Sequence, residues 1–104
     1  MIGVYVAVFF GGLFFANGIP HLLNGLQGRK FPTPFAKPPG RGESSSLANT
    51  LWGAFNLIIA WVLLCQVVRF DIHSITEFAV AFVGGLLISL FLAWNFGKVY
   101  GGSK

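Results

Sequence analysis

Three long apolar stretches dominate the pattern of the chain, and shorter polar segments separate them. They cover residues 2–23, 47–68 and 75–96. Each is close to the roughly 20 residues that a helix needs to cross about 30 Å of hydrocarbon. Backbone groups in lipid must be hydrogen-bonded within the protein, and three segments cannot close a barrel. The pattern therefore predicts an all-α membrane protein with three transmembrane helices, in a single membrane domain over residues 1–104.

Composition supports this class. Hydrophobic residues make up 55% of the 104 residues and charged ones 10%, whereas about 25% of a typical soluble domain is charged. The first stretch has no basic segment before it and no Ala-x-Ala cleavage site after it, so we expect it to remain as a helix and not to be removed as a signal peptide.

The basic residues predict an orientation. Arg69 stands alone in the short connection after the second stretch. The other six fall in residues 24–46 or after the third stretch: Arg29, Lys30, Lys37, Arg41, Lys98 and Lys104. By the positive-inside rule, residues 24–46 and the C-terminus are cytoplasmic and the N-terminus is outside. Without a basic stripe, nucleic acid is not an expected partner; anionic lipid headgroups on the cytoplasmic side are.

Uncharged polar residues gather in the same half of all three stretches. Asn17, His21 and Asn24 are spaced i, i+4, i+7 and so share one helix face. Asn49 and Asn56 lie one heptad apart in the second stretch, and the third adds Ser89 and Asn95 in that half. Because an amide or imidazole facing lipid is unfavourable, these side chains should point inward, where they pair or line a wet cavity.

Three interpretations of this cluster remain open. The side chains could form hydrogen bonds that hold the helices together, line a ligand recess that opens to the cytoplasm, or support catalysis with His21 as a base. Pro20 lacks an N–H and should bend or open the helix beside His21. No nucleophile or carboxylate stands at matching spacing, and His73 lies on the opposite side. Cys65 is the only cysteine and is expected to be packed. We therefore predict no catalytic residue, no metal and no cofactor.

The connection between the first two stretches is patterned. Its four prolines and four glycines exclude a continuous helix. Phe31 and Phe35 stand among the prolines and should lie at the lipid headgroups or fold over the inner mouth of the bundle. The mouth of the predicted recess would carry three cations: Arg29, Lys30 and Arg41.

Local motifs predict helix ends and packing faces. Ser74 and Glu77 have the spacing of a capping box, and one of three serines, 44–46, should cap the second helix. Small residues spaced for close helix packing recur in the first and third stretches: Gly3, Ala7, Gly11 and Gly18, and Ala81, Gly85, Ser89 and Ala93.

Four short segments within residues 11–57 form a recognisable pattern: Asn17-Gly18-Ile19-Pro20-His21, Phe31-Pro32-Thr33-Pro34-Phe35-Ala36, Pro39-Gly40 and Leu51-Trp52-Gly53. By these segments the chain resembles small bacterial inner-membrane proteins that have no established activity. More distantly, the chain resembles the DoxX-like membrane proteins, which usually have four spans where this chain has three. The resemblance implies a bacterial inner membrane and assigns no site residue.

The leading hypothesis is a small non-enzymatic membrane protein, a homo-oligomer or the accessory subunit of a partner membrane protein. It would hold a lipid-like or small polar ligand near the cytoplasmic face. The candidate binding residues are Asn17, His21, Asn24, Asn49 and Asn56, with Arg29, Lys30 and Arg41 at the mouth. The alternative is an oligomeric transporter or pore, holin-like or for small solutes, since three helices alone enclose too little space. A membrane enzyme using His21 is the third hypothesis.

Overall fold

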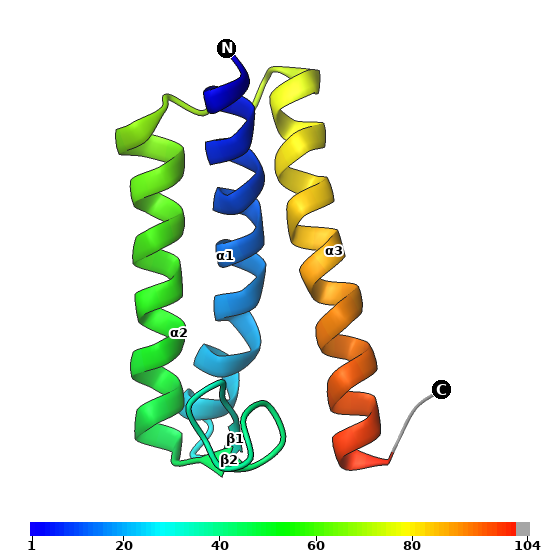
Figure 1. Cartoon of the computed structure of the whole chain (residues 1–104). Coiled ribbons are helices and arrows are strands. Elements are labelled where there is room, and N and C mark those ends of the chain that lie inside the picture. Colours follow the sequence, from blue (N-terminus) through cyan, green and yellow to red (C-terminus); the bar gives the residue numbers. More distant parts are fainter. Residues whose placement is uncertain (102–104) are drawn as a thin grey trace.

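The computed structural model describes residues 1–101, so Lys104 of the predicted basic tail lies outside them. Three helices and one pair of short strands make up the fold (Figure 1). The elements are α1 (Ile2–Leu26), β1 (Phe31–Pro32), β2 (Glu43–Ser44), α2 (Ser46–Trp61), its π-helical continuation η1 (Val62–Val67), and α3 (Ile75–Tyr100). Three helical segments, α1, α2 with η1, and α3, are long and apolar enough to cross a membrane. The predicted all-α membrane protein is confirmed.

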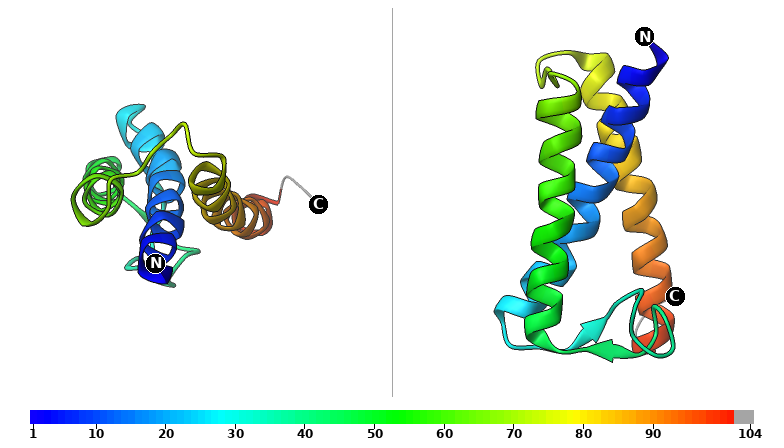
Figure 2. Two further views of the ribbon diagram at one scale, coloured as in Figure 1. Left: turned by 90° about the horizontal axis from the view of Figure 1, so that it is seen from above. Right: turned by 60° about the vertical axis from the view of Figure 1, so that its left-hand side comes forward.

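Helix α1 stands in the middle of the molecule. It packs against both α2 and α3, which have little direct contact with each other; seen from above, the three helices form a row with α1 at its centre (Figure 2). The N-terminus and the α2–α3 connection lie at one end (Figure 1). The loop 27–45 and the last turn of α3 lie at the other, which we call the loop end. The predicted sharing of one side by loop and C-terminus is therefore correct.

Glycines allow α1 to approach α2 closely. A Cβ added to Gly53 would lie 2.5 Å from the Leu22 nitrogen and 2.9 Å from the Gly18 carbonyl oxygen, too close for any side chain. Gly18 belongs to the predicted small-residue face of the first helix, and Gly11 of that face meets Leu64 of η1. A Cβ added to Gly3 would meet nothing within 4 Å, so this glycine is not needed for a close helix contact.

The contact between α1 and α3 uses a different set of small residues. A Cβ on Gly12 would overlap the Ala81 carbonyl oxygen, and one on Gly84 would overlap that of Phe9. Gly85 of the predicted strip also lies at this contact, 3.2 Å from the Gly12 carbonyl oxygen when given a Cβ. Ser89 and Ala93, from the same strip, are exposed, because the strip turns away from α1 along the helix.

Few side chains are buried inside the chain. Gly84 is the single buried residue of α3, and η1 buries none. Cys65 in η1 is exposed, so its expected packing is wrong. Large apolar side chains cover the outside of all three helices. Such a surface is unfavourable in water and suits a lipid surrounding.

Side-chain caps begin α2 and α3. Ser45 Oγ accepts from the Ala48 amide at 3.1 Å, and Ser74 Oγ accepts from the Glu77 amide at 3.2 Å. A capping box also has a bond from the Ser74 amide back to the Glu77 side chain, and this part of the prediction is wrong. Glu77 Oε1 accepts from the Asp71 amide at 2.9 Å, because the Ser74 amide already donates to the Asp71 carbonyl oxygen.

Candidate ligand recess at the loop end

The loop 27–45 is a folded element that ties α3 to the rest of the chain. It crosses beneath α1 and α2 and reaches the last turns of α3 (Figure 2, right). Asn95 Nδ2 donates to the Gly40 carbonyl oxygen at 2.9 Å, and the Tyr100 hydroxyl donates to Glu43 Oε2 at 2.7 Å. The loop therefore fills the space at the loop end where α3 stands away from its neighbours.

The two loop phenylalanines have different places. Phe31 is buried and meets His21 edge-on, with ring centroids 5.4 Å apart, and Phe96 at 4.5 Å. Phe35 is 55% exposed and touches Trp52 edge-on at 5.5 Å. Of the two predicted positions, Phe31 takes the one folded over the end of the bundle.

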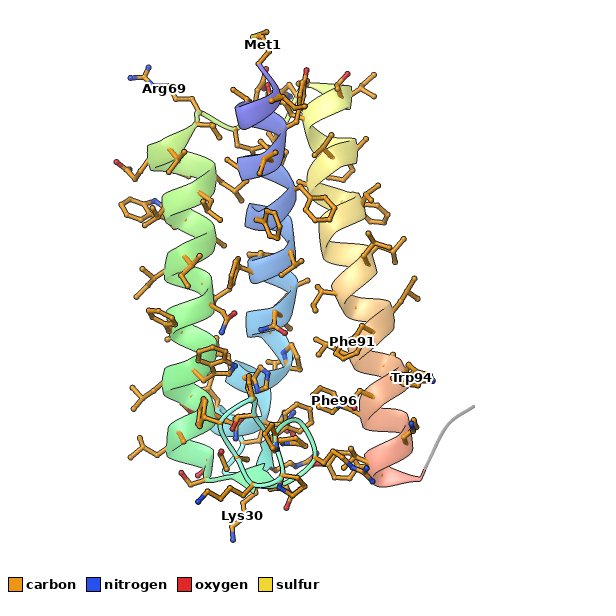
Figure 3. The ribbon with its side chains drawn as sticks, viewed as in Figure 1. Met1, Lys30, Arg69, Phe91, Trp94 and Phe96 are labelled. Atoms are coloured by element: carbon orange, nitrogen blue, oxygen red, sulfur yellow. The ribbon has the colours of Figure 1, made fainter. Side chains whose placement is uncertain are left out.

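A partly open recess of about 410 Å³ lies between α1, α3 and the loop. Its volume is within the range of about 300–1,000 Å³ found for small-molecule sites. The lining residues are Asn17, His21, Pro32, Thr33, Pro34, Pro39, Gly40, Ile88, Phe91, Leu92, Asn95 and Phe96. Phe96 points from α3 toward α1 and the loop, whereas Trp94 points away from them (Figure 3). We call this space the loop-end recess.

Backbone carbonyls fix the orientation of His21 through Asn49. Asn49 Nδ2 lies 2.9 Å from the Phe31 carbonyl oxygen and within 3.2 Å of two more, those of Ser44 and Ser45. Since only an NH₂ group can face three carbonyls, Asn49 Oδ1 must be the atom 2.8 Å from His21 Nδ1. His21 Nδ1 therefore carries a hydrogen. In the neutral ring, Nε2 is then left as an acceptor.

The same reasoning fixes Asn17. Asn56 Nδ2 donates to the Trp52 carbonyl oxygen at 2.8 Å, so Asn56 Oδ1 is an acceptor. Asn17 Nδ2 donates to that oxygen at 3.0 Å. Asn95 Nδ2 is likewise held by the Gly40 carbonyl oxygen. The oxygen atoms of Asn17 and Asn95 thus point away from these partners.

Three acceptor atoms of recess residues are left without a hydrogen bond within residues 1–101: Asn17 Oδ1, His21 Nε2 and Asn95 Oδ1. None of them is sealed in the core, because in that part of the chain only Trp52 Nε1 is both fully buried and unpartnered. These acceptors are therefore accessible to a molecule in the loop-end recess.

The structure brings only part of the predicted cluster to the recess. Asn17 and His21 line it; Asn49 and Asn56 do not, since both are 0% exposed and bond α1 to α2. Asn24 bonds to the Pro20 carbonyl oxygen of its own helix at 2.8 Å. Of the predicted bend or opening of the helix at Pro20, the opening does not occur, because α1 continues without a break to Leu26.

The predicted mouth residues lie outside the recess. Arg29, Lys30 and Arg41 are exposed at the loop end, and none of them lines it. Asn95 and Thr33 do line it and were not among the candidates. Asn95 had a sequence signal, a polar residue in the same half of the third stretch, whereas Thr33 had none beyond its place between two prolines.

A second groove, of about 530 Å³, lies toward the other end between α1, α3 and their connections. It is almost wholly apolar, and its one hydroxyl, of Ser89, donates to the Gly85 carbonyl oxygen at 2.7 Å. Nothing in this groove would orient a polar ligand. Within residues 1–101, no three His, Cys, Asp or Glu side chains gather as a metal site would require.

In comparisons with known proteins, no family model, no curated protein and no solved structure matches this chain.

Proposed function

We propose that this chain is a non-enzymatic protein of a bacterial inner membrane that holds an amphipathic, lipid-like molecule in the loop-end recess. Two kinds of lining support this. Ile88, Phe91 and Leu92 offer hydrocarbon on the α3 side, while His21 and Asn95 offer polar atoms nearer the loop. Because α1 and α3 cross the membrane, a ligand enters from the bilayer itself, with its tail along α3 and its polar end at the loop.

The hydrogen bonding of His21 is the observation that supports the proposal most directly. His21 is 2% exposed and held by Asn49, yet its Nε2 has no partner in the described chain and is not itself fully buried. A molecule in the recess that donates to Nε2 gives this acceptor its hydrogen bond, which is worth about 0.5–1.5 kcal/mol.

Catalysis finds less support. His21 is the one lining residue whose side chain could act as a base, and no carboxylate, thiol or lysine lines the recess with it. A general base without a second group has no partner for a proton cycle. The recess also lies within one chain, so ligand binding needs no oligomer, whereas the alternative of a pore does.

The exposed cations have a separate role in this proposal. Arg29, Lys30 and Arg41 meet anionic headgroups of the cytoplasmic leaflet, which keeps the loop end on that side. Each such cation near an anionic membrane surface contributes about 1 kcal/mol.

Two substitutions of His21 test the proposal because they separate its two nitrogens. His21→Asn places an amide nitrogen where Nδ1 stands, keeps the bond to Asn49 and removes Nε2. His21→Gln keeps an acceptor near the position of Nε2 and loses the bond to Asn49. Native mass spectrometry of protein released from mild detergent reads any bound mass. We expect wild type and His21→Gln to carry a discrete mass that His21→Asn lacks.

Stability provides the control. Both variants lose the packing of the imidazole against Phe31 and Phe96, but His21→Asn should lose less stability than His21→Gln because it keeps the bond to Asn49. If His21→Asn keeps the bound mass, or if wild type carries none, the recess is not a ligand site and His21 serves only to join the helices.

A further inference from the structure

The polar atoms of the loop-end recess select a chemical class of ligand. We infer that the molecule held there presents hydrogen-bond donors, an O–H or a primary N–H, and not an anionic group. This inference rests on the proposed function, since it concerns the polar end of the same ligand.

The side chains of the recess offer acceptors. Asn17 Oδ1, His21 Nε2 and Asn95 Oδ1 are unpartnered within the described chain. The amide nitrogens of Asn17 and Asn95 each have one N–H engaged, by Asn56 and by the loop backbone, and one N–H left. A phosphate or carboxylate oxygen placed beside the three acceptor atoms would meet lone pairs, and the two remaining amide hydrogens belong to neutral groups that do not offset its charge.

The loop backbone that lines the recess is also poor in donors. Pro32, Pro34 and Pro39 line it and have no N–H. The Gly40 amide, beside them, donates to the Thr33 carbonyl oxygen at 2.8 Å. An anion site built from backbone needs several N–H groups that point at the ligand, and this wall does not supply them.

The lack of charged side chains in the recess also favours a ligand with hydrogen-bond donors over an anion. No Lys or Arg lines the recess, so an anion would enter without a counter-charge and would lose its hydration. The hydroxyls of Thr33 and Ser44 lie 2.6 Å apart and bond to each other, which leaves that pair one hydrogen. A hydroxyl can donate its one hydrogen to His21 Nε2 or to either amide oxygen without such a cost. A primary ammonium also loses hydration, but its three N–H groups match the three acceptors.

Matched lipids with identical acyl chains test this. Phosphatidylethanolamine and phosphatidylcholine have the same net charge, but only the first has N–H donors. A diacylglycerol and its 3-O-methyl ether differ only in the hydroxyl hydrogen. Phosphatidylmethanol is anionic and has no donor. Delipidated protein is incubated with equimolar mixtures of these lipids, and native mass spectrometry reads what it retains.

We expect the donor-bearing member of one pair to be retained about tenfold over its partner, as the loss of one or two buried hydrogen bonds implies. Preference within the first pair identifies an ammonium, and preference within the second a hydroxyl. His21→Asn should retain neither member of the pair.

Two results would overturn the inference in distinguishable ways. If donor-free lipids or phosphatidylmethanol are retained equally well, and all are lost in His21→Asn, the recess binds lipid but does not select donors. If wild type retains no lipid at all, the proposed function fails together with the inference.

Discussion

Asn49 should be the side chain on which the loop end depends most. It is 0% exposed and joins three elements, since its oxygen accepts from His21 of α1 and its nitrogen donates to the Phe31 carbonyl of β1. In Asn49→Ala the buried His21 Nδ1–H and Phe31 carbonyl both lose this partner. At about 1–3 kcal/mol for each group left without a partner, and with some relaxation of the loop, we expect a loss of about 2–4 kcal/mol.

Asn24→Ala is a matched control, because it deletes the same side chain from a half-buried site where its one bond stays within α1. The free energy of unfolding is measured for both variants by reversible SDS titration in micelles, followed by far-UV circular dichroism. Hydrogen exchange of residues 29–46 should rise in Asn49→Ala only, because β1 loses its tie to α2. If the free energies of unfolding of the two variants differ by less than about 1 kcal/mol, the cost of leaving buried groups unpaired does not apply here and the reasoning is wrong.

Two further predictions concern packing and orientation. Gly12→Val should separate α3 from α1 and lower the free energy of unfolding by at least about 2 kcal/mol, as overpacking does. Gly3→Val is the control and should change it little, because a Cβ at Gly3 meets nothing within 4 Å. Equal unfolding midpoints of the two variants would contradict the close contact at Gly12. In a variant lacking the exposed Cys65, a cysteine at Lys30 should react with a membrane-impermeant thiol reagent only from the cytoplasm, and one at His73 only from outside. Labelling of the His73 position from the cytoplasm would reverse the predicted orientation.

Helix packing could be predicted from the sequence only in part. The small-residue face of the first helix was recognised, and Gly18 does lie against α2. The contact of Gly12 with α3 was missed, because spacing within one helix reveals a face but not the partner that it meets. Gly85, from the predicted small-residue strip of the third stretch, packs against Gly12 within the chain, so enlarging it would disturb the bundle.

The candidate site, too, could be predicted only in part from the sequence. A polar residue in an apolar stretch must find a partner, so the sequence was enough to indicate that Asn17, His21, Asn49 and Asn56 pair inward. Which of them stays open to a ligand depends on the loop. The bonds of Asn49 to the loop backbone, and of Asn95 to Gly40, join residues distant in sequence.

The amino-acid pattern by itself determined the three helices, their lengths within a few residues and the end at which loop and C-terminus meet, because each follows from local hydrophobicity and chain reversal. The tertiary structure decided the rest. It placed α1 between α2 and α3, folded a proline-rich loop over the end of the bundle with Phe31 buried, and left His21 lining a recess with Nδ1 bonded to Asn49. Those features depend on which carbonyl reaches which amide across the bundle, and only the folded chain brings these groups together.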